Sequence, residues 1–430
     1  MNKRRVLVTV LDGVGVRESD YGNAVKLATT PYLDLLKRCS MGTTLKAHGT
    51  YVGLPSDSDI GNSEVGHNAL GAGRIFDQGA KLVGKAISDG SIFNGKTWHS
   101  LVKSVHSSNG VLHLIGLLSD GNVHAHQDHV HSMMERAKKD GVKKVRLHVL
   151  LDGRDVGQTT AEIYIDRLEA KIAELKSQDF DVQVASGGGR MTTTMDRYDA
   201  EWPMVERGWN AHVLGTAEFR FESLSQAISY FRSETEIIDQ YLPTFVIENN
   251  GSPVGTINDG DGVVFWNFRG DRAIEISKCF TEESISFFDR KRVPKVFYAG
   301  MMEYDGDLHI PARFLVEPPA IDDTLGENLA HQGIKQYACS ETQKFGHVTY
   351  FWNGNRSGYF DKSVEEYVQI DSDVIPFDQK PWMKAAEITM ATEERLLSGS
   401  FDVGRINYAN GDMVGPVSYT HLRAHETDSY

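Results

Sequence analysis

Short apolar runs alternate with helical patterns along the chain, and this alternation restricts the possible fold more than any other feature. The apolar runs are typical of buried strands. They are Val6–Leu11, Val111–Leu118, Val145–Leu151, Val182–Ala185, Val263–Asn267, Val296–Ala299, Tyr337–Cys339, Val348–Phe351 and Arg405–Tyr408. The clearest helical patterns between them are Ala161–Leu175 and Ala385–Leu397. Strands separated by helices predict an α/β protein with mainly parallel sheets.

Polar motifs directly follow many of these runs. They are Asp12, the loop 120–129, Asp152–Asp155, Gly187–Arg190 and Asn267–Arg272. Open α/β sheets bind their ligands at the carboxyl ends of the strands, where such loops gather. The pattern therefore predicts a ligand pocket, although it does not say what chemistry the pocket performs.

Length and composition agree with a soluble enzyme of two domains. A chain of 430 residues is long for a single core, and its hydrophobic content of 40% and charged content of 24% are ordinary for globular proteins. The net charge of -14 disfavours nucleic acid and anionic membranes as partners. The three cysteines are too few and too scattered for a disulfide framework or a zinc site, which indicates a reducing, cytoplasmic setting.

The amino-terminal residues MNKRRVLVTVL combine a basic start with an apolar run, as a signal peptide does. The apolar run is too short for that role and ends in Asp12, so it is interpreted as the first strand. No stretch of the sequence is long and apolar enough to span a membrane.

A glycine-rich segment from Gly61 to Arg74 places Ser63 at the start of a predicted short helix. The first turn of a helix has unpaired N–H groups and a partial positive charge, which favour a phosphate. Ser63 could therefore accept a phosphoryl group, or it could simply cap the helix, as serine often does. Asp12, at the end of the first predicted strand, would supply a metal ligand beside such a nucleophile.

Several long motifs carry a resemblance to a known family. They are LDGVGVRE, YVGLPSDSDIGNSEVGHNALGAGRIFDQGAKLV, LLSDGNVHAHQDH, DGRDVG, ASGGGRMTTTMDRYD, FWNFRGDRA, CSETQKFGHVTYFWNG and NYANGDMVG. With these motifs, from about Arg4 to Gly415, the chain resembles the cofactor-independent phosphoglycerate mutases of the alkaline phosphatase superfamily, most of all those of plants and trypanosomatids. The resemblance implies an alkaline-phosphatase-like fold of two domains. A split and incomplete phosphatase domain, 1–78 and 319–415, would carry the serine and metals, and an inserted α/β transferase domain, 79–318, would bind substrate.

The resemblance also implies a set of substrate-binding residues, most of them arginines. Arginine binds carboxylate and phosphate through two parallel hydrogen bonds, although any single arginine is more often part of a surface ion pair. The matched residues are His124, Arg154, Asp155, Arg190, Arg197, Arg269, Arg272 and Lys344. His126 and His129 could suggest a metal cluster with His124, but we expect them to begin a solvated helix.

The reaction implied by the resemblance converts 3-phosphoglycerate to 2-phosphoglycerate in glycolysis and gluconeogenesis, without 2,3-bisphosphoglycerate. The phosphoryl group would pass through Ser63. Two divalent metals, manganese ahead of magnesium or cobalt, would lower the pKa of the serine and neutralise charge. Asp12 and Ser63 would bind one ion and Asp412 the other. We expect a cytoplasmic monomer whose only partners are small-molecule substrates.

The sequence departs from the family after Gly415. The family continues with further metal-binding residues, whereas this chain ends in a tail, 416–430, that matches nothing in it. His421 and His425 of the tail are not expected to replace the lost ligands. We therefore expect that the chain as written is a fragment without two bound metals or significant mutase activity. Two alternatives stay open: a related metal-dependent phosphatase or phosphopentomutase, and a non-catalytic chain that binds phosphorylated ligands.

Overall fold

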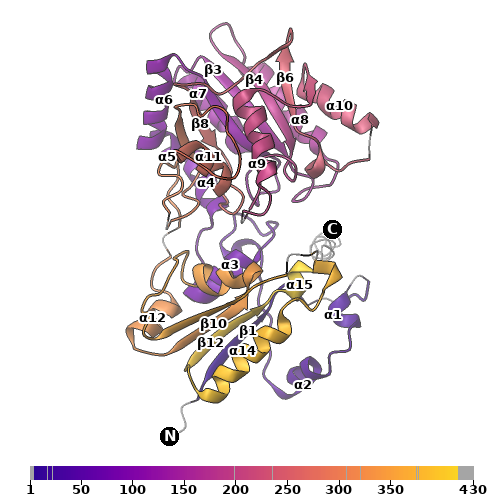
Figure 1. Cartoon of the computed structure of the whole chain (residues 1–430), viewed down its shortest axis with the longest axis vertical. Coiled ribbons are helices and arrows are strands. Elements are labelled where there is room, and N and C mark those ends of the chain that lie inside the picture. Colours follow the sequence, from indigo (N-terminus) through magenta and orange to yellow (C-terminus); the bar gives the residue numbers. More distant parts are fainter. Residues whose placement is uncertain are drawn as a thin grey trace. The chain divides into compact units, whose positions relative to one another are not determined.

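The computed structural model describes residues 4–414 except Arg17, Gly22, Tyr198, Thr235, Asp307, Ala320, Val374 and Pro376. Gly415 and the tail 416–430, with His421 and His425, lie outside the described residues. The chain divides into two compact units, unit 1 from Met1–Asp77 and Ala320–Tyr430, and unit 2 from Gln78–Pro319 (Figure 1).

Unit 1 is built on a four-stranded sheet in the order β1-β12-β10-β11, in which all neighbouring strands are parallel. Its strands are β1 (Val6–Leu11), β10 (Gln336–Glu341), β11 (Glu365–Ile370) and β12 (Val403–Tyr408). The first strand of the chain therefore pairs with the last one, which brings the loops after residues 11 and 408 to the same edge of the sheet.

Helices and helical turns surround this sheet. They are α1 (Ala24–Leu27), α2 (Pro31–Cys39), η1 (Gly49–Val52), α3 (Ser63–Ala72), α12 (Leu325–His331), α13 (Thr342–Gly346), the π-helical turn η4 (His347–Phe351), η5 (Phe377–Gln379), α14 (Ala385–Ser398) and α15 (Asn410–Met413). Helix α14 packs on β10 and β12, and η4 packs on the same two strands and on α3. The core beneath α14 is small and consists of Tyr337, Cys339, Ile388, Phe401 and Ile406.

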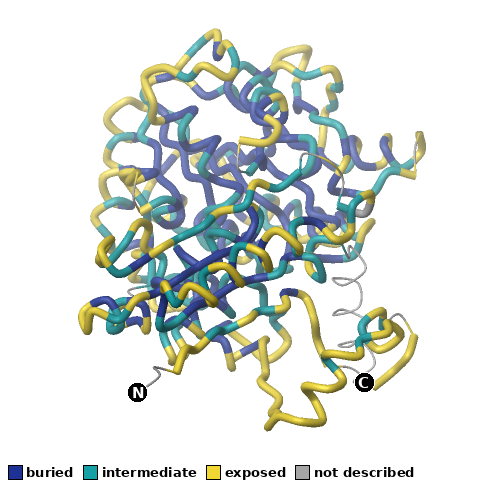
Figure 2. Tube along the Cα trace, turned by 60° about the horizontal axis from the view of Figure 1, so that its bottom comes forward, coloured by how far each residue is buried: buried dark blue, intermediate teal, exposed yellow. Residues whose placement is uncertain are grey.

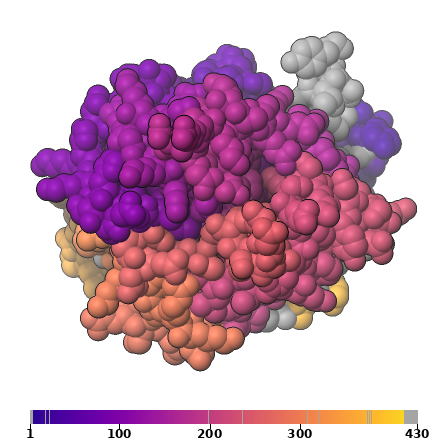
Figure 3. Space-filling view, turned by 90° about the horizontal axis from the view of Figure 1, so that it is seen from above, coloured from indigo at the N-terminus to yellow at the C-terminus, as the bar shows by residue number. Residues whose placement is uncertain are grey.

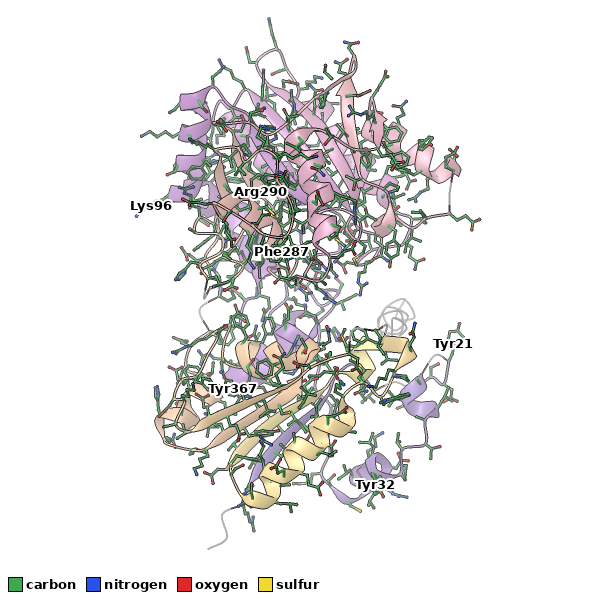
Figure 4. The ribbon with its side chains drawn as sticks, in the orientation of Figure 1. Tyr21, Tyr32, Lys96, Phe287, Arg290 and Tyr367 are labelled. Carbon is green, nitrogen blue, oxygen red and sulfur yellow. The ribbon has the colours of Figure 1, made fainter. Side chains whose placement is uncertain are left out.

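The segment after β1 is highly exposed. None of the residues of α1 or α2 is buried, and Tyr21 and Tyr32 are 85% and 81% exposed (Figure 4). Figure 2 shows this part of the chain largely in the colour of exposed residues. It therefore adds little to the core of unit 1.

Unit 2 has an eight-stranded sheet in the order β5-β6-β4-β3-β2-β8-β9, with β7 paired to β6. The strands are β2 (Leu112–Leu118), β3 (Lys144–Leu151), β4 (Asp181–Gly189), β5 (Phe219–Phe221), β6 (Phe245–Asn249), β7 (Ser252–Pro253), β8 (Gly262–Phe265) and β9 (Phe297–Gly300). Among the described strands of this sheet, the pairs β4/β6 and β6/β7 are antiparallel and the others are parallel. The central strands β2, β3 and β8 are mostly apolar and almost wholly buried, as expected for a parallel sheet covered on both faces.

The helical elements of unit 2 are α4 (Gly79–Ser88), α5 (Ser91–Asn94), α6 (Lys96–Ser108), α7 (Gln127–Lys139), α8 (Ala161–Leu175), α9 (Trp202–Trp209), the π-helical turn η2 (Asn210–Leu214), α10 (Leu224–Glu234), η3 (Asp239–Tyr241) and α11 (Ile274–Thr281). Helix α6 packs on β8 and β9, so the beginning and end of unit 2 adjoin, and the purple and orange surfaces meet in Figure 3. A single large core runs from Ala80 to Val316 within this unit.

The α/β prediction is correct, and most predicted strands lie within a few residues of observed ones. The predicted helices 161–175 and 385–397 correspond to α8 and α14. The prediction of a strand at Val348–Phe351 is wrong, because this run forms the π-helical turn η4. A short apolar run fits a buried strand or a buried helical turn equally well, and here the turn packs on β10, β12 and α3.

Candidate active site

Ser63 is the first residue of α3, but it does not cap the helix. The side chain of Asn62 does so by accepting a hydrogen bond from the Val65 N–H at 3.1 Å. The hydroxyl of Ser63 is therefore available for other contacts. It donates to Oδ1 of Asp12 at 2.7 Å and accepts from Nζ of Lys344 at 2.7 Å.

Lys344 joins the polar groups of unit 1. It lies in α13, directly after β10, and its side chain is only 5% exposed. Besides Ser63, its Nζ contacts Oδ2 of Asp412 at 2.6 Å and Oδ2 of Asp12 at 3.2 Å. We call these four residues, Asp12, Ser63, Lys344 and Asp412, the serine cluster. The resemblance predicts Lys344 as a substrate-binding residue, and the structure buries its side chain among oxygen atoms of unit 1.

The approach of two carboxylates in this cluster depends on a glycine. Gly13 follows Asp12 with a φ of 74°, and a Cβ at this position would lie 2.4 Å from the backbone N of Asp412. Burial opposes the charge of Asp12, yet the nearby Lys344 ammonium and hydrogen bonds from Asn407 and Ser63 hold its pKa below the usual value. Asp12 is therefore an anion that is held by its neighbours.

Two further residues contact this cluster and were missed by the sequence analysis. The Nδ2 of Asn407, at the end of β12, lies 2.9 Å from Oδ2 of Asp12 and 3.2 Å from Nε2 of His67. The other ring nitrogen of His67 lies 2.6 Å from the carbonyl oxygen of Ser63, one helical turn earlier. Since that carbonyl can only accept, Nδ1 of His67 carries the hydrogen and Nε2 accepts from Asn407. Burial lowers the pKa of His67, which agrees with a neutral ring.

Five of the predicted substrate residues are gathered in unit 2, in the loops after β2, β4 and β8. We call this group the arginine cluster; it consists of His124, Arg190, Arg197, Arg269, Asp271 and Arg272. Asp271 is the carboxylate at its centre: it lies 3.1 Å from Nε of Arg269 and 3.7 Å from Nη1 of Arg197. Asp271 was also missed, although it lies between two predicted arginines in the sequence.

Arg190 is held by two acidic residues of the loop after β3. Its Nη1 contacts Oδ1 of Asp152 at 2.9 Å and also Oδ2 of Asp155. Asp152 accepts hydrogen bonds from the Ser119 hydroxyl and from the backbone N–H groups of residues 154 and 155. Arg190 and both carboxylates are almost completely buried. This ion pair network therefore fixes the loop after β4 against the loop after β3.

The cationic charge of the cluster exceeds what its carboxylates neutralise. Burial and the nearby charges of Arg197 and Arg190 lower the pKa of Arg272 to about 9. Burial and the surrounding arginines also hold the pKa of His124 well below its usual value, so its ring is neutral near pH 7. A buried group of guanidinium groups that destabilise one another would be stabilised by an anion.

The remaining predicted residues of unit 2 differ in placement. Arg154 belongs to the same loop as Asp155 but is exposed, and its charge still acts on Arg272. The expectation of a solvated helix start at His126 and His129 is wrong in part. His126 caps α7 through its side chain, whereas His129 is buried and burial lowers its pKa to about 3. His129 instead packs against the ring of Phe268.

A cavity of about 640 Å³ lies beside Asp12 in unit 1. Its lining is mostly apolar and includes Leu11, Leu33, Met390 and Tyr408. Such a lining does not suit a phosphate, so the polar serine cluster, not this cavity, is the candidate for phosphate chemistry.

The comparisons with known proteins all point to the same family. Residues 83–306 match the family model described as the BPG-independent PGAM N-terminus. A relative named probable 2,3-bisphosphoglycerate-independent phosphoglycerate mutase, from Leptospira interrogans, is 57% identical over 415 residues, which are 96% of this chain and 76% of the relative. The 2,3-bisphosphoglycerate-independent phosphoglycerate mutase of Zea mays is 51% identical over 96% of this chain and 74% of its own length.

A solved structure shows the same likeness in three dimensions. It is a phosphoglycerate mutase of Leishmania mexicana, determined at low cobalt concentration. Its TM-score to this chain is 0.90 at 49% identity, and the match covers 99% of this chain and 79% of that one.

Proposed function

Because the chain belongs to the family of 2,3-bisphosphoglycerate-independent phosphoglycerate mutases, we propose that it interconverts 3-phosphoglycerate and 2-phosphoglycerate through a phosphoserine at Ser63. The observation that carries this proposal is the serine cluster. A hydroxyl at the start of α3 is relieved of helix capping by Asn62 and is held between a carboxylate and an ammonium group. Such a hydroxyl is placed to act as a nucleophile rather than as a structural cap.

Unit 2 is the substrate-binding unit in this proposal, and unit 1 carries the nucleophile. The arginine cluster would bind both anionic groups of phosphoglycerate, since guanidinium groups form paired hydrogen bonds with carboxylate and phosphate. His124 would contribute a neutral ring beside them, and Asp271 would orient Arg197 and Arg269. Arg154, which is exposed in the same loop as Asp155, would reach the ligand from outside.

The phosphoryl transfer would be a balanced exchange of two P–O bonds. Oγ of Ser63 forms a bond to phosphorus while the bond between phosphorus and the C3 oxygen of the substrate breaks, and the proton that Ser63 loses passes to that oxygen. The C2 hydroxyl of the glycerate then attacks the phosphoserine, the P–Oγ bond breaks, and the proton of the C2 hydroxyl restores the serine hydroxyl. Asp12 holds the hydroxyl hydrogen of Ser63, and Lys344 opposes the negative charge that develops on Oγ.

The oxygen donors of the serine cluster fit a hard divalent cation in type. Asp12, Ser63 and Asp412 surround the Lys344 ammonium, so this position already favours positive charge. Asp12 and Ser63 would hold one ion and Asp412 a second, and carboxylates and alkoxide suit manganese, with magnesium or cobalt as alternatives. Bound metal would acidify the serine and neutralise the transferring group. Among the described residues no three His, Cys, Asp or Glu side chains gather at one point, so such ions would keep water ligands there.

We place this activity in the cytoplasm. Cys39, Cys279 and Cys339 are all free thiols in the structure, which agrees with a reducing compartment. Within the described residues, no helix has the length and apolar character that crossing a membrane would need.

The decisive experiment follows the serine itself. The purified chain is incubated with manganese and 3-phosphoglycerate, 2-phosphoglycerate is measured with enolase, and acid-quenched protein is digested for mass spectrometry. We expect a phosphate on the peptide that contains Ser63, and the loss of turnover and phosphopeptide in Ser63→Ala but not in the exposed control Ser58→Ala. The same assay measures directly whether this chain has mutase activity.

If the chain shows no turnover, the same substitution is made in a longer relative with the GNSEVGHN motif. Substantial mutase activity in the alanine variant, or a phosphate on another residue, would end the proposal. Release of inorganic phosphate in place of 2-phosphoglycerate would point to a phosphatase.

A further inference from the structure

Six buried polar side chains form one continuous hydrogen-bonded chain through the core of unit 2. In order they are Asp261, His113, His148, Ser186, His212 and Thr194, and we call them the histidine chain. The successive distances are 3.2 Å (Asp261 Oδ2 to His113 Nε2), 3.0 Å (His113 Nδ1 to His148 Nε2), 2.7 Å (His148 Nδ1 to Ser186 Oγ), 2.7 Å (Ser186 Oγ to His212 Nδ1) and 2.8 Å (His212 Nε2 to Thr194 Oγ1). None of the six is more than 4% exposed.

An irregularity of the sheet brings the middle of this chain together. Strands β2, β3 and β4 are neighbours, and His148 lies on β3 between the other two. The register of β3 and β4 shifts after Leu147, which pairs with Val184, so that His148 pairs with Ser186 and Ala185 is the extra residue. Without this β-bulge Ala185 would oppose His148, and Ser186 would point to the other face of the sheet.

The direction of each hydrogen bond in the histidine chain can be deduced by starting from the carboxylate of Asp261. Asp261 also accepts hydrogen bonds from the backbone N–H groups of Val111 and Asn258. Burial raises the pKa of its carboxyl, but these hydrogen bonds and the contact with His113 lower it by more, so the net shift is downward. As an ionised carboxylate it can only accept, so Nε2 of His113 carries the hydrogen. Burial lowers the pKa of both His113 and His148, which keeps both rings neutral. Nδ1 of His113 must then accept from Nε2 of His148.

The remaining hydrogen bonds, from His148 to Thr194, can be assigned in the same way. Nδ1 of His148 has no hydrogen, so the Ser186 hydroxyl donates to it and accepts from Nδ1 of His212. Burial lowers the pKa of His212 to about 3, so this ring is neutral too and its Nε2 accepts from the Thr194 hydroxyl. All the hydrogens therefore point towards Asp261, and only one tautomer of each histidine fits.

Thr194 links this chain to the loop that carries two of the cluster arginines. It lies between Arg190 and Arg197 with a φ of 71°, a conformation that β-branched residues rarely adopt. The next residue, Met195, accepts a hydrogen bond from Nη1 of Arg272 at 2.6 Å through its carbonyl oxygen. A Cβ on Gly208 would lie 2.0 Å from Oγ1 of Thr194, so the surrounding structure leaves room for this hydroxyl.

We propose that His212 is a positioning residue for the substrate-binding arginines, which it holds in place by accepting the Thr194 hydrogen bond that fixes the loop 190–197. The rest of the histidine chain sets the tautomer in which Nε2 of His212 can accept. This inference rests on the proposed function, because it assumes that the loop arginines bind 3-phosphoglycerate. Apolar side chains could fill this part of the core without any hydrogen-bond partner, whereas buried polar side chains must all find one. Packing alone therefore does not explain the histidines at these positions.

The first test compares two variants of Thr194 in the full chain. Thr194→Val removes the hydroxyl and keeps the β-branched shape, whereas Thr194→Ser keeps the hydroxyl. Calorimetry with 3-phosphoglycerate in manganese should show binding weakened about tenfold in the valine variant and within about twofold of wild type in the serine variant. Equal affinity of the valine variant and the wild type would overturn the proposal.

The second test separates positioning from stability. In His212→Asn the amide nitrogen replaces Nδ1 and keeps the donation to Ser186, while in His212→Gln the amide oxygen replaces Nε2 and keeps the acceptor for Thr194. Both variants leave one buried group unmatched, so their melting temperatures should fall alike. Positioning predicts that only the asparagine variant loses affinity about tenfold, while a purely structural role predicts equal losses, and equal losses would refute the proposal.

A spectroscopic measurement keeps this inference separate from the proposed function. In protein labelled with ¹⁵N-histidine, His212 should appear as the Nδ1–H tautomer and His113 and His148 as Nε2–H tautomers at pH 7. If the wild type binds no 3-phosphoglycerate, the proposed function fails. The positioning role is then tested by the Nε–H resonances of Arg190 and Arg197 in protein labelled with ¹⁵N-arginine. They should shift in Thr194→Val but not in Thr194→Ser. A protonated or Nε2–H His212, or unshifted arginine resonances, would contradict the inference.

Discussion

The two units place polar clusters at the carboxyl ends of parallel strands, but the clusters have opposite chemistry. In unit 1, two carboxylates and a hydroxyl surround one ammonium group. In unit 2, four arginines surround one central carboxylate, and the pKa of Arg272 falls to about 9. The strand order determines where such groups gather, whereas the charges of the loop residues determine whether a cation or an anion is stabilised. One protein therefore offers an oxygen-rich site and a guanidinium-rich site on the same architecture.

The two clusters also differ in the size of the hydrophobic core that supports them. The arginine cluster lies on a sheet whose core extends through the whole of unit 2. The serine cluster lies on a four-stranded sheet with a core of a few side chains around Ile388 and Phe401. We therefore expect substitutions in unit 2 to change mainly the cost of burying charged groups. Substitutions in unit 1 should change mainly the competition between the Lys344 ammonium and a divalent metal for the same oxygen atoms.

The largest effect is expected from Arg190→Met. This change leaves Asp152 and Asp155 buried without their cation, which should lower the free energy of unfolding of unit 2 by about 3–5 kcal/mol and abolish 3-phosphoglycerate binding. Urea unfolding and calorimetry measure the two effects. As a control, Arg167→Met removes a pair with Asp120 at the surface and should cost about 0–1 kcal/mol. Similar costs for both variants would show that unit 2 does not depend on buried charge as described.

Lys344→Met tests the cationic position of unit 1. Asp12 loses its buried partner, and we expect a loss of about 2–4 kcal/mol in the absence of divalent metal. Because the ammonium no longer competes for the same oxygens, manganese should raise the melting temperature more in this variant than in the wild type. Thermal unfolding with and without manganese measures this, with the exposed Lys37→Met as the control. An equal response to manganese would mean that the lysine and the metal do not share their ligands.

Glu275→Gln tests how unit 2 tolerates a buried carboxylate that forms no ion pair with any residue the structure describes. Burial, with the nearby Asp196 and Asp199, raises the pKa of Glu275 to about 7. A raised pKa in the folded state stabilises the protein below about pH 4.5, and this contribution is lost as the pH rises through about 7. The wild type should therefore lose on the order of 1–3 kcal/mol more than the variant between pH 5 and pH 8. Denaturant titrations at both pH values check this, and the exposed Glu282→Gln should retain the wild-type pH dependence.

The smallest effect is expected from Asn62→Ala, which separates capping from catalysis in α3. The variant loses the side-chain cap on Val65 and should be about 1 kcal/mol less stable. Its phosphoserine should still form, because the contacts of the Ser63 hydroxyl come from Asp12 and Lys344. Loss of the phosphopeptide without loss of stability would reverse the roles assigned to these two residues.

Much of the fold could be predicted from the sequence, because long apolar strands are recognisable by themselves. The run 145–151, for example, appears as β3 with its last seven residues buried. The edge strand β11 was missed, since its sequence EEYVQI mixes polar and apolar residues at the margin of the sheet. The run 348–351 was assigned to the wrong element because four apolar residues do not distinguish a strand from a helical turn.

The candidate site shows the same limit at the level of side chains. Ser63 was proposed from its place at the start of a predicted helix, whereas Lys344 was proposed only because it matches a motif of the family that the chain resembles. The contact between His67 and Asn407 joins residues 340 positions apart, so no local sequence pattern could predict it. The histidine chain depends on the bulge at Ala185, whose presence is decided by the pairing of two strands and not by either strand alone.

The single direction of the histidine chain limits how this part of the core can change. Every hydrogen in it is matched to one lone pair, so a substitution that adds or removes a hydrogen creates a mismatch between two neighbours. The mismatch can be passed along the chain but can be absorbed only at its ends, where the carboxyl of Asp261 can take a proton or the hydroxyl of Thr194 can rotate. In a library randomised at these positions, functional members should therefore carry compensating pairs of changes, although the paired positions lie far apart in the sequence.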